Sequence, residues 1–404
     1  MSWALDLILG AHNWYQGVSK IAASTKKTAS PLRLGILGAA AINPAAIFDP
    51  VSTHPDVIIV GIAARSKSKA EAQIKQYSLT SARAYSSYDD LLSDPTIEAV
   101  YVPLPNGLHA EWAIKALQAG KHVLLEKPIA SNAQQVRDIR RVSEETGEVA
   151  LEAFHWRLYP AAHLVKSLVD SGEYGKATEV KAKWELPAGL FAKDDIRFHY
   201  DLAGGSCMDL MYVFSATSYY ATPTPNLKDA EVEVLEAKAR PNKTDPRIDD
   251  AMSATYVLRS DSHSTLCKIE ADLAAPWLWG LVPKFWTLMP SLSIEMEQAT
   301  ILFPGFAGPW SGHAITVTDK ATGKVTKHSQ YVDGAQWGQR GARFWTTYRY
   351  QLEAFVDKVR AVQAGADVRR LGEMSGPWVS LDESEAVVGI VEKVYEKAGI
   401  PLRK

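Results

Sequence analysis

The sequence predicts an α/β protein in which an N-terminal Rossmann domain precedes an α+β domain with a large open, mostly antiparallel sheet. From about residue 32 to residue 153, short apolar runs alternate with segments of helical periodicity, as in a parallel sheet covered on both faces. After about residue 154, apolar and polar residues alternate with a period of two, as in strands with one exposed face. The expected parts are a helical arm (1–30), the Rossmann domain (31–153) and the sheet domain (154–404).

Each expected strand of the Rossmann domain is followed by an expected helix, except the last. The strands are the runs 32–37, 57–64, 97–104, 121–126 and 148–154. The helices are the segments 43–51, 66–77, 108–120 and 132–147. Ligands of such sheets bind outside the carboxyl ends of the strands, so the loops that follow these runs are where we expect functional residues.

The rest of the chain reads as strands separated by turns, with two helices at the end. The strands are the runs 177–186, 231–240, 252–260, 264–273, 292–303 and 313–319, and the helices are 348–364 and 381–398. The arm lacks the basic residues of a signal peptide and is too short in its apolar run to span a bilayer. We expect it to dock on a partner surface, with a targeting role as the alternative.

Composition excludes several classes of protein. The 44 basic and 46 acidic residues nearly balance and form no long run of one sign, so neither a nucleic-acid surface nor a membrane-surface helix is expected. The apolar stretch 275–290 is broken by Pro283 and contains Lys284, so no membrane span is expected there. Cys207 and Cys267 have no partners at metal-ligand spacing, so neither a disulfide framework nor a metal site is predicted. The default setting is the reducing cytoplasm.

The turn after the first strand resembles a dinucleotide fingerprint with one glycine kept. Gly38, Ala40 and Asn43 stand at the three places of G-x-G-x-x-G. Alanine still allows the backbone to approach a pyrophosphate, so we expect Gly38, Ala39, Ala40 and Ile42 to bind the cofactor. A plain strand-to-helix turn is the alternative.

The end of the second strand favours NADP over NAD. An NAD site places an acid there for the ribose 2′-hydroxyl, whereas a 2′-phosphate needs cations and hydroxyls. Arg65, Ser66, Ser68 and Lys69 supply cations and hydroxyls without an acid. The alternative is a solvated helix start that is basic by chance.

Two further loops carry candidate residues. After the third long strand, Pro103 and Pro105 stiffen a loop in which Leu104, Asn106 and His109 are expected on the cofactor side, although a helix-start histidine is often structural.

The next strand ends in Glu126-Lys127-Pro128. A lysine there can stabilise a developing alkoxide, and Pro128, which allows a cis as well as a trans peptide bond, fixes its backbone. A surface turn is the alternative.

The chain resembles the Gfo/Idh/MocA family (glucose-fructose oxidoreductase and inositol dehydrogenase), and within it the fungal members related to dimeric dihydrodiol dehydrogenase and NADP-dependent D-xylose dehydrogenase. The resemblance covers about residues 32–403 and rests on GILGAAAI, VPLPNGLH, GKHVLLEKP, EAFHWRLYP, LAGGSCMDL and TYRYQLEAFVDKVR. It implies a homodimer formed through the open sheet. It also implies that Lys127 is the active-site lysine, that Glu126 frames it, and that Trp156 and Arg157 line the substrate cleft.

The family's second active-site motif is altered here. It has an aspartate followed, commonly four residues later, by a histidine or tyrosine that acts as acid/base, whereas here Asp209 is followed by Tyr212 after three. Because spacings of three and four share a helix face, we expect Tyr212 to serve. The alternatives are a helix start shifted by one residue, loss of the acid/base, and a core tyrosine. Free tyrosine titrates near pH 10, so a close ammonium would be needed for it to act near neutrality.

The resulting prediction is an NADP-dependent dehydrogenase or reductase acting on a secondary alcohol or hemiacetal of a sugar or cyclic diol. Lys127, Tyr212 and Asp209 are its expected catalytic residues, and Arg197 and His199 are expected to add polar groups for a small-molecule substrate. Two alternatives stay open. One is a catalytically silent NADP-binding protein, which Asn43 and the displaced Tyr212 favour, and the other is a specialised natural-product or non-redox enzyme, which the many tryptophans would suit.

Overall fold

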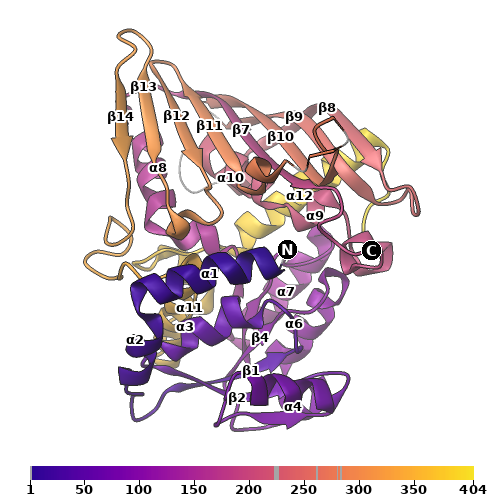
Figure 1. Ribbon diagram of the computed structural model, residues 1–404, viewed down its shortest axis with the longest axis vertical. Coiled ribbons are helices and arrows are strands. Elements are labelled where there is room, and N and C mark those ends of the chain that lie inside the picture. The colour runs from indigo at the N-terminus through magenta and orange to yellow at the C-terminus, as the bar shows by residue number, and fades with distance from the viewer. Residues whose placement is uncertain (1, 223–226, 261–262, 280, 283) are drawn as a thin grey trace. The chain divides into compact units, whose positions relative to one another are not determined.

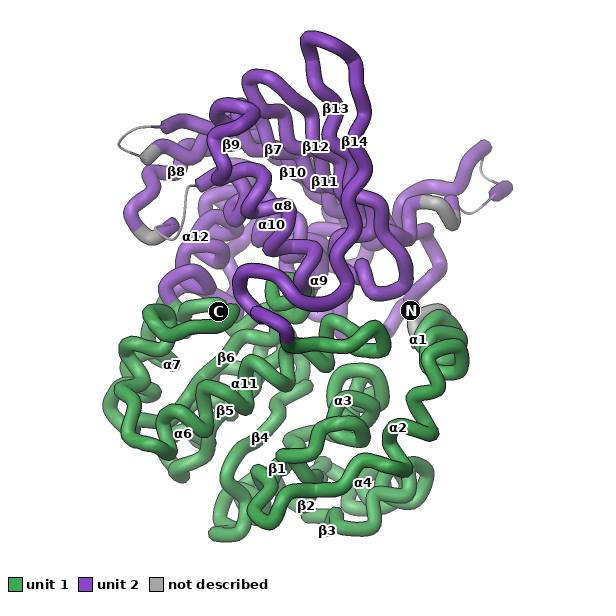
Figure 2. Tube along the Cα trace, turned by 90° about the vertical axis from the view of Figure 1, so that its left-hand side faces the viewer, with its two compact units in different colours: residues 1–130, 134–159, 340–381 green, residues 131–133, 160–339, 382–404 purple. Residues whose placement is uncertain are grey.

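The computed structural model describes residues 2–222, 227–260, 263–279, 281–282 and 284–404 (Figure 1). By their contacts these residues form two compact units, coloured separately in Figure 2. Unit 1 holds residues 1–130, 134–159 and 340–381, and unit 2 holds 131–133, 160–339 and 382–404. Each unit is built around one sheet.

The sheet of unit 1 is parallel throughout, with strand order β3-β2-β1-β4-β5-β6, which confirms the Rossmann prediction. Its strands are β1 (Leu32–Leu37), β2 (Val57–Ala63), β3 (Arg83–Tyr85), β4 (Ala99–Val102), β5 (His122–Leu125) and β6 (Ala150–Glu152). β4 is shorter than the expected run because Pro103 follows it and lacks the amide that a ladder needs. The short β3 was not predicted.

Helices follow the strands of unit 1, as expected after β1, β2, β4 and β5. The helices after β3 and β6 were not expected. They are η1 (Pro44–Phe48), α3 (Asp49–Ser52), α4 (Lys67–Gln76), α5 (Tyr88–Leu92), η2 (Asn106–Leu108), α6 (His109–Gln118), α7 (Ala133–Thr146) and η3 (His155–Leu158). The strand order reverses between β1 and β4, where a ligand crevice is expected in folds of this kind.

Unit 1 also contains α11 (Thr347–Gln363), which packs on η1, α3 and η3. The sequence-based ranges place this helix in the domain 154–404. The compact units follow contacts rather than chain continuity, so the ranges 1–30, 31–153 and 154–404 stay a prediction.

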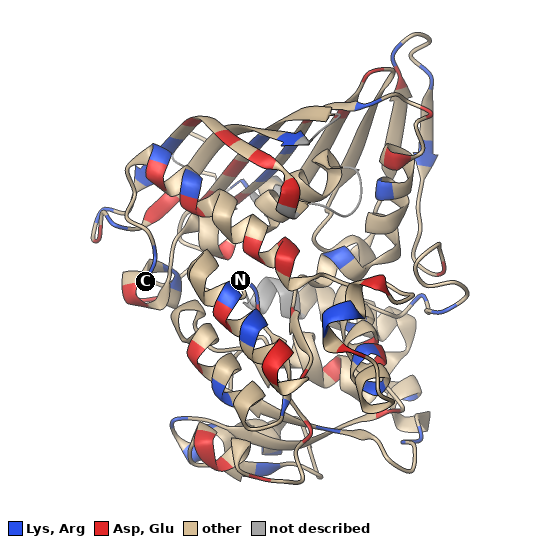
Figure 3. Cartoon of the chain, turned by 180° about the vertical axis from the view of Figure 1, so that it is seen from behind, with Lys and Arg blue, Asp and Glu red and all other residues tan. Residues whose placement is uncertain are grey.

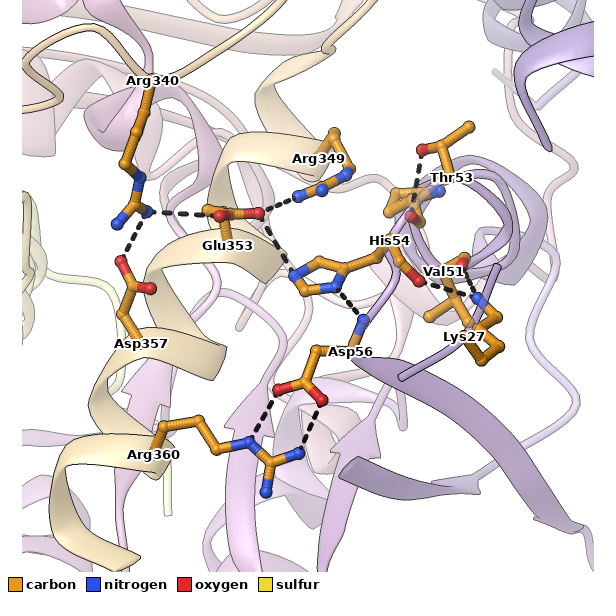
Figure 4. Close-up of polar contacts among 11 residues, drawn as sticks. Lys27, Val51, Thr53, His54, Asp56, Arg340, Arg349, Glu353, Asp357 and Arg360 are labelled. Atoms are coloured by element: carbon orange, nitrogen blue, oxygen red, sulfur yellow. Dashed lines mark hydrogen bonds and ion pairs between the residues drawn. The ribbon is translucent and has the colours of Figure 1, made fainter. Parts of the chain in front are cut away.

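The N-terminal arm consists of α1 (Ser2–Gln16) and α2 (Val18–Ser24) and belongs to unit 1. His12 Nε2 lies 3.2 Å from the carbonyl oxygen of Phe344, and Asn13 donates to Asp49 at 2.7 Å. After α2, Lys27 Nζ donates to the carbonyls of Val51 and His54, both at 2.7 Å, at the end of α3 (Figure 4). The arm thus has polar anchors on its own chain.

The second sheet has the order β14-β13-β12-β11-β7-β10-β9-β8 and is antiparallel except for the pair β7 and β10. Its strands are β7 (Ala177–Pro187), β8 (Glu231–Pro241), β9 (Asp249–Ser260), β10 (His263–Ala275), β11 (Ser291–Met296), β12 (Ala299–Pro304), β13 (Ile315–Asp319) and β14 (Val325–His328). The mostly antiparallel prediction is confirmed. The run 292–303, expected as one strand, is the hairpin β11–β12, because the chain turns at Glu297 and Gln298.

Helices of unit 2 pack on one side of this sheet. They include α8 (Pro160–Asp170), α9 (Ser206–Asp209), α10 (Tyr212–Ala221) and α12 (Leu381–Ala398), and α10 contacts β7 and β10. Along β7, the buried Val180 and Ala182 alternate with Lys181 and Lys183, whose ammonium groups lie 2.7 and 2.8 Å from Glu270 of β10. One face of the sheet is therefore apolar and the other carries ion pairs.

The distribution of charge, the hydropathy of the helices and the placement of metal-ligating side chains can each be described for these residues. Figure 3 shows basic and acidic residues interspersed over the chain. Among the described residues, no helix is long and apolar enough to cross a membrane, and no cluster of three or more His, Cys, Asp or Glu side chains is arranged to hold a metal ion.

Candidate active site

The turn after β1 is closed by polar side chains as well as by glycine. Gly38 has φ +128°, where a side chain would be strained, and its amide donates to the Ala63 carbonyl at 2.8 Å. Asn43 is fully buried, and its Nδ2 donates to the Gly38 carbonyl and to Gln73 Oε1, both at 2.9 Å. Gln73 of α4 in turn donates to the Ala40 carbonyl at 3.1 Å. Gln73 was not predicted as a site residue, because its position within an expected helix gave no reason to place it beside the turn.

The turn and the loop after β4 meet. A Cβ atom added at Gly38 would lie 3.2 Å from Leu104 Cδ2 and 3.7 Å from the Pro103 carbonyl. Ala39, Ala40 and Ile42 are half-buried beside Gly38 in the chain, and Asn106 begins η2. The structure thus brings together the turn and the proline loop, which the sequence assigned to one cofactor site.

The residues after β2 form an exposed cationic group. Within the described chain, no carboxylate pairs with Arg65 or with Lys69, and the hydroxyls of Ser66 and Ser68 lie 2.8 Å apart. Burial raises the pKa of Tyr88, and the positive charge of Arg65 offsets part of that rise. These groups can accept a dianionic phosphate without first breaking an ion pair.

His109 ties two loops together. It is fully buried, with Nδ1 2.7 Å from the Pro128 carbonyl and Nε2 2.7 Å from the Leu104 carbonyl. Burial lowers its pKa to about 4, so the neutral ring donates its one N–H to one of these carbonyls. His109 was expected on the cofactor side, and in the structure it holds the loops after β4 and β5.

Lys127 follows β5 in a frame made by Glu126. Tyr101 donates its hydroxyl to Glu126 Oε1 at 2.6 Å, and the backbone amide of Lys127 donates to Glu126 Oε2 at 3.2 Å. The Lys127–Pro128 peptide bond is cis, as the sequence suggested it could be. Lys127 is half-buried, and its backbone is held by the hydrogen bond to Glu126.

Two unpredicted aromatic side chains lie near this lysine. Burial and the charge of Lys127 lower the pKa of His155 to about 3, and the His155 ring packs against Tyr348, with centroids 4.2 Å apart. Tyr348 lies on α11, almost two hundred residues along the chain. It stands in the motif TYRYQLEAFVDKVR, as His155 stands in EAFHWRLYP, but neither was predicted as a site residue. Arg157 is buried, with Cζ 6.0 Å from the ring of Trp156, and Trp156 is itself fully buried in the core.

In unit 2, Asp209 and Tyr212 lie on different helices. Asp209 ends α9 and Tyr212 begins α10, because Leu210, with φ −97° and ψ 29°, leaves the helical region between them. The expectation that both share one helix face is therefore wrong. The Tyr212 ring is almost fully buried and meets Trp184 edge to face, with centroids 5.0 Å apart.

Asp209 is paired with Arg197, which the sequence predicted as a substrate residue. Arg197 Nε lies 2.8 Å from Asp209 Oδ2, and its Nη1 lies 2.9 Å from Asp195 Oδ1. Burial disfavours the guanidinium charge, but the two carboxylates outweigh it and raise the pKa of Arg197. The His199 ring is exposed and lies 3.2 Å from the Asp194 carbonyl; within the described residues, no side-chain hydrogen bond joins it to this cluster.

A parallel sheet with a dinucleotide-type turn, a cationic group after β2 and a framed lysine after β5 defines a Rossmann-fold protein of the oxidoreductase class. Residues 32–154 match the model of the oxidoreductase family with an NAD-binding Rossmann fold. The chain is 30% identical over 382 residues to D-xylose 1-dehydrogenase (NADP(+)) 2 of Haloferax volcanii, covering 91% of this chain and 97% of that protein. It belongs to the Gfo/Idh/MocA family.

Two further comparisons agree with this assignment. The chain is 30% identical over 162 residues to trans-1,2-dihydrobenzene-1,2-diol dehydrogenase of Xenopus laevis, which covers 40% of this chain and 48% of that protein. The fold matches the crystal structure of KijD10, a 3-ketoreductase from Actinomadura kijaniata in complex with NADP and TDP-benzene. That match has a TM-score of 0.70 and 21% identity, and it covers 90% of this chain and 98% of that one.

Proposed function

We propose that the protein is an NADP-dependent oxidoreductase that interconverts a secondary alcohol or hemiacetal of a sugar or cyclic diol with its carbonyl form. The observation that carries this proposal is the framed Lys127 at the carboxyl end of β5, in the sheet whose β1 turn is built around Gly38. The names of the xylose and dihydrodiol dehydrogenases among its relatives support the same substrate class.

The residues after β2 support NADP rather than NAD. Arg65 and Lys69 have no carboxylate partner within the described chain, and no acid stands where NAD enzymes bind the 2′-hydroxyl. Residue 38 has a positive φ, and an added Cβ there would lie close to Leu104. The missing side chain of Gly38 therefore supports a close approach of a pyrophosphate to the backbone. When bound, the nicotinamide would supply the hydride acceptor or donor.

We assign roles to three side chains. In the oxidative direction the substrate loses a hydride from carbon and a proton from oxygen, and a carbonyl forms. Lys127 stabilises the developing alkoxide by charge and hydrogen bonding, and Tyr212, in its phenolate form, receives the proton and becomes the neutral phenol. Asp209, through its ion pair with Arg197, orients the segment that carries Tyr212.

The ion pairs of Arg197 in unit 2 support a neutral substrate. Arg197 is already bound to Asp209 and Asp195, so its guanidinium is not available as a counter-ion for a carboxylate or phosphate. A polyol can use the remaining lone pairs of these carboxylates as hydrogen-bond acceptors. We therefore propose a neutral sugar or diol.

We also propose a homodimer formed through the ion-paired face of the second sheet, and a cytoplasmic setting. The dimer proposal is supported by Lys181 and Lys183 of β7, which with Glu270 present a polar face opposite the helices of unit 2. The setting is supported by Cys207 and Cys267, which are buried free thiols.

The proposal is tested with the purified protein, by fluorescence titration with NADPH and NADH and by nicotinamide absorbance with D-xylose and a cyclic trans-diol. We expect tighter binding of NADPH and turnover of at least one substrate. Lys127→Ala should abolish most turnover and keep NADPH binding, whereas Lys115→Ala, in an exposed pair with Glu111, should change neither. Binding without turnover on either substrate would favour the silent protein or the specialised enzyme.

A further inference from the structure

The penultimate residue of the chain is a buried arginine with all of its donors used. The side chain of Arg403 is 1% exposed. Its Nε donates to the Gly204 carbonyl at 3.0 Å, and its Nη1 donates to the carbonyls of Arg247 and Pro401 at 3.0 and 2.9 Å. Its Nη2 lies 2.9 Å from Asp249 Oδ1 and donates to the Tyr395 hydroxyl oxygen at 3.2 Å. Burying a guanidinium costs desolvation free energy, which only well-placed hydrogen-bond partners offset. These contacts therefore hold Arg403 and its partners in one arrangement.

Asp249 links the Arg403 contacts to the start of α9. Its Oδ1 accepts from Arg403 and from the Tyr395 hydroxyl at 2.8 Å. Its Oδ2 accepts from the Ser206 hydroxyl at 2.7 Å and from the Cys207 amide at 2.8 Å. The carboxylate, which is fully buried, therefore joins the end of the chain to the first turn of the helix that ends at Asp209.

Two glycines let the chain pass between these groups. At Gly205, with φ +128°, an added Cβ would overlap Asp249 Oδ1 and lie 2.7 Å from Arg403 Nη2. At Gly204 it would overlap the Arg197 carbonyl. The Gly205 amide donates to that same carbonyl at 2.9 Å, so the segment is held between Arg403 and the residue that pairs with Asp209.

We propose that Arg403 is a positioning residue for the reaction, acting with Asp249 on the segment 204–212. The pair holds the glycines and the first turn of α9, and through them it sets the place of Asp209 and the start of α10 at Tyr212. This inference rests on the proposed function, because it matters for catalysis only if Tyr212 takes part. Arg403 lies outside every motif that indicated the site.

The test uses the full-length protein with Arg403→Lys, which keeps the charge and loses the planar fork, and Ser206→Ala, which removes one bond of the relay and should fold normally. Lys166→Met is the matched control. Lys166 is also buried in unit 2 and pairs with Asp170 at 2.8 Å, but it lies on α8. Its hydrogen bond to α10 goes to the Thr222 carbonyl after the last residue of that helix, whereas Tyr212 is the first residue. Two quantities are measured below the melting temperature of every variant: kcat and KM for the substrate, and hydrogen–deuterium exchange of peptides covering 204–212.

For Arg403→Lys we expect faster exchange in 204–212 and a fall in kcat on the order of 10- to 100-fold, the scale that a displacement of about 1 Å can cause. NADPH affinity should stay within about twofold, because the cofactor groups belong to unit 1. Ser206→Ala should show the same pattern more weakly, and Lys166→Met should leave both quantities as in the wild type.

Unchanged exchange in 204–212 in both test variants would overturn the relay. Faster exchange with unchanged kcat would overturn the positioning role and leave a structural clamp. If the wild type itself turned over no substrate, the proposed function would fail, while the exchange result would still decide whether the relay exists.

Discussion

Replacing Glu353 of α11 with glutamine should destabilise unit 1 by about 3 kcal/mol near pH 7. Its carboxylate is the centre of the network in Figure 4, where Arg349, His54 and Arg340 all contact it. His54 Nε2 lies 3.2 Å from Oε2 and Arg340 Nη2 lies 3.3 Å from Oε1. The side chain is 19% exposed, and that of Arg349 is 5% exposed. A neutral amide would leave the Arg349 charge buried without its counter-ion.

The magnitude follows from the pKa of this carboxyl. Burial would raise it, but the hydrogen bond from His54 and the charge of Arg349 outweigh burial and lower the pKa of Glu353 from 4.5 to about 2. A difference of roughly 2.5 units at about 1.4 kcal/mol each gives about 3 kcal/mol. Because the folded pKa is lowered, this stability is fully present above pH 4.5 and is lost as the pH falls toward 2. At pH 3.5 about 2 kcal/mol should remain.

The assay is urea unfolding followed by circular dichroism at pH 7 and pH 3.5. Glu145→Gln is the control, because Glu145 pairs with Arg141 on α7 in the same unit with both side chains more than half exposed. The control should lose at most a few tenths of a kcal/mol. The reasoning is refuted if Glu353→Gln costs no more than the control, or if its cost is the same at both pH values.

Three further predictions concern the proposed site. Arg65→Ala should raise the Kd for NADPH about tenfold or more and leave that for NADH unchanged in fluorescence titrations, with the exposed Lys67→Ala as control; equal losses for both dinucleotides would argue against a 2′-phosphate site. Gly38→Val should weaken binding of both dinucleotides, because φ +128° strains a branched side chain and Leu104 lies against it; unchanged titrations would contradict this. Tyr212→Phe should lower kcat about 100-fold and keep the Kd for NADPH, and a kcat near wild type would remove Tyr212 from the reaction.

Local patterns predicted most of the fold. Continuous apolar runs and period-two runs predicted a parallel and a mostly antiparallel sheet, and the helix 381–398 matches α12 to the residue. Such patterns repeat every few residues, so they can be recognised without knowing which element the strand or helix packs against. The loops after β1, β4 and β5 were also expected to lie together, because parallel strands end at one edge.

Contacts between distant residues could not be predicted in this way. No local pattern links Arg403 to Asp249, or Gln73 to Asn43, because each partner lies in an unrelated element. The break at Leu210 was missed for a different reason. The expectation for Asp209 and Tyr212 used their spacing alone, while the start of α9 is held by contacts with β9 and Arg403 that no local pattern shows.

The structure also bears on the silent-protein alternative, which rested on Asn43 and on the spacing of Tyr212. The third fingerprint glycine normally allows close helix–strand packing. Here Ala45 and Ala46 of η1 supply small buried side chains, 2% and 0% exposed, and Asn43 turns inward to bond the Gly38 carbonyl. We infer that the substitution at 43 is accommodated and does not weaken the turn, so it no longer favours a silent site. The choice between an enzyme and a silent protein therefore depends on Tyr212, whose place after the break at Leu210 depends in turn on α9 and its anchors.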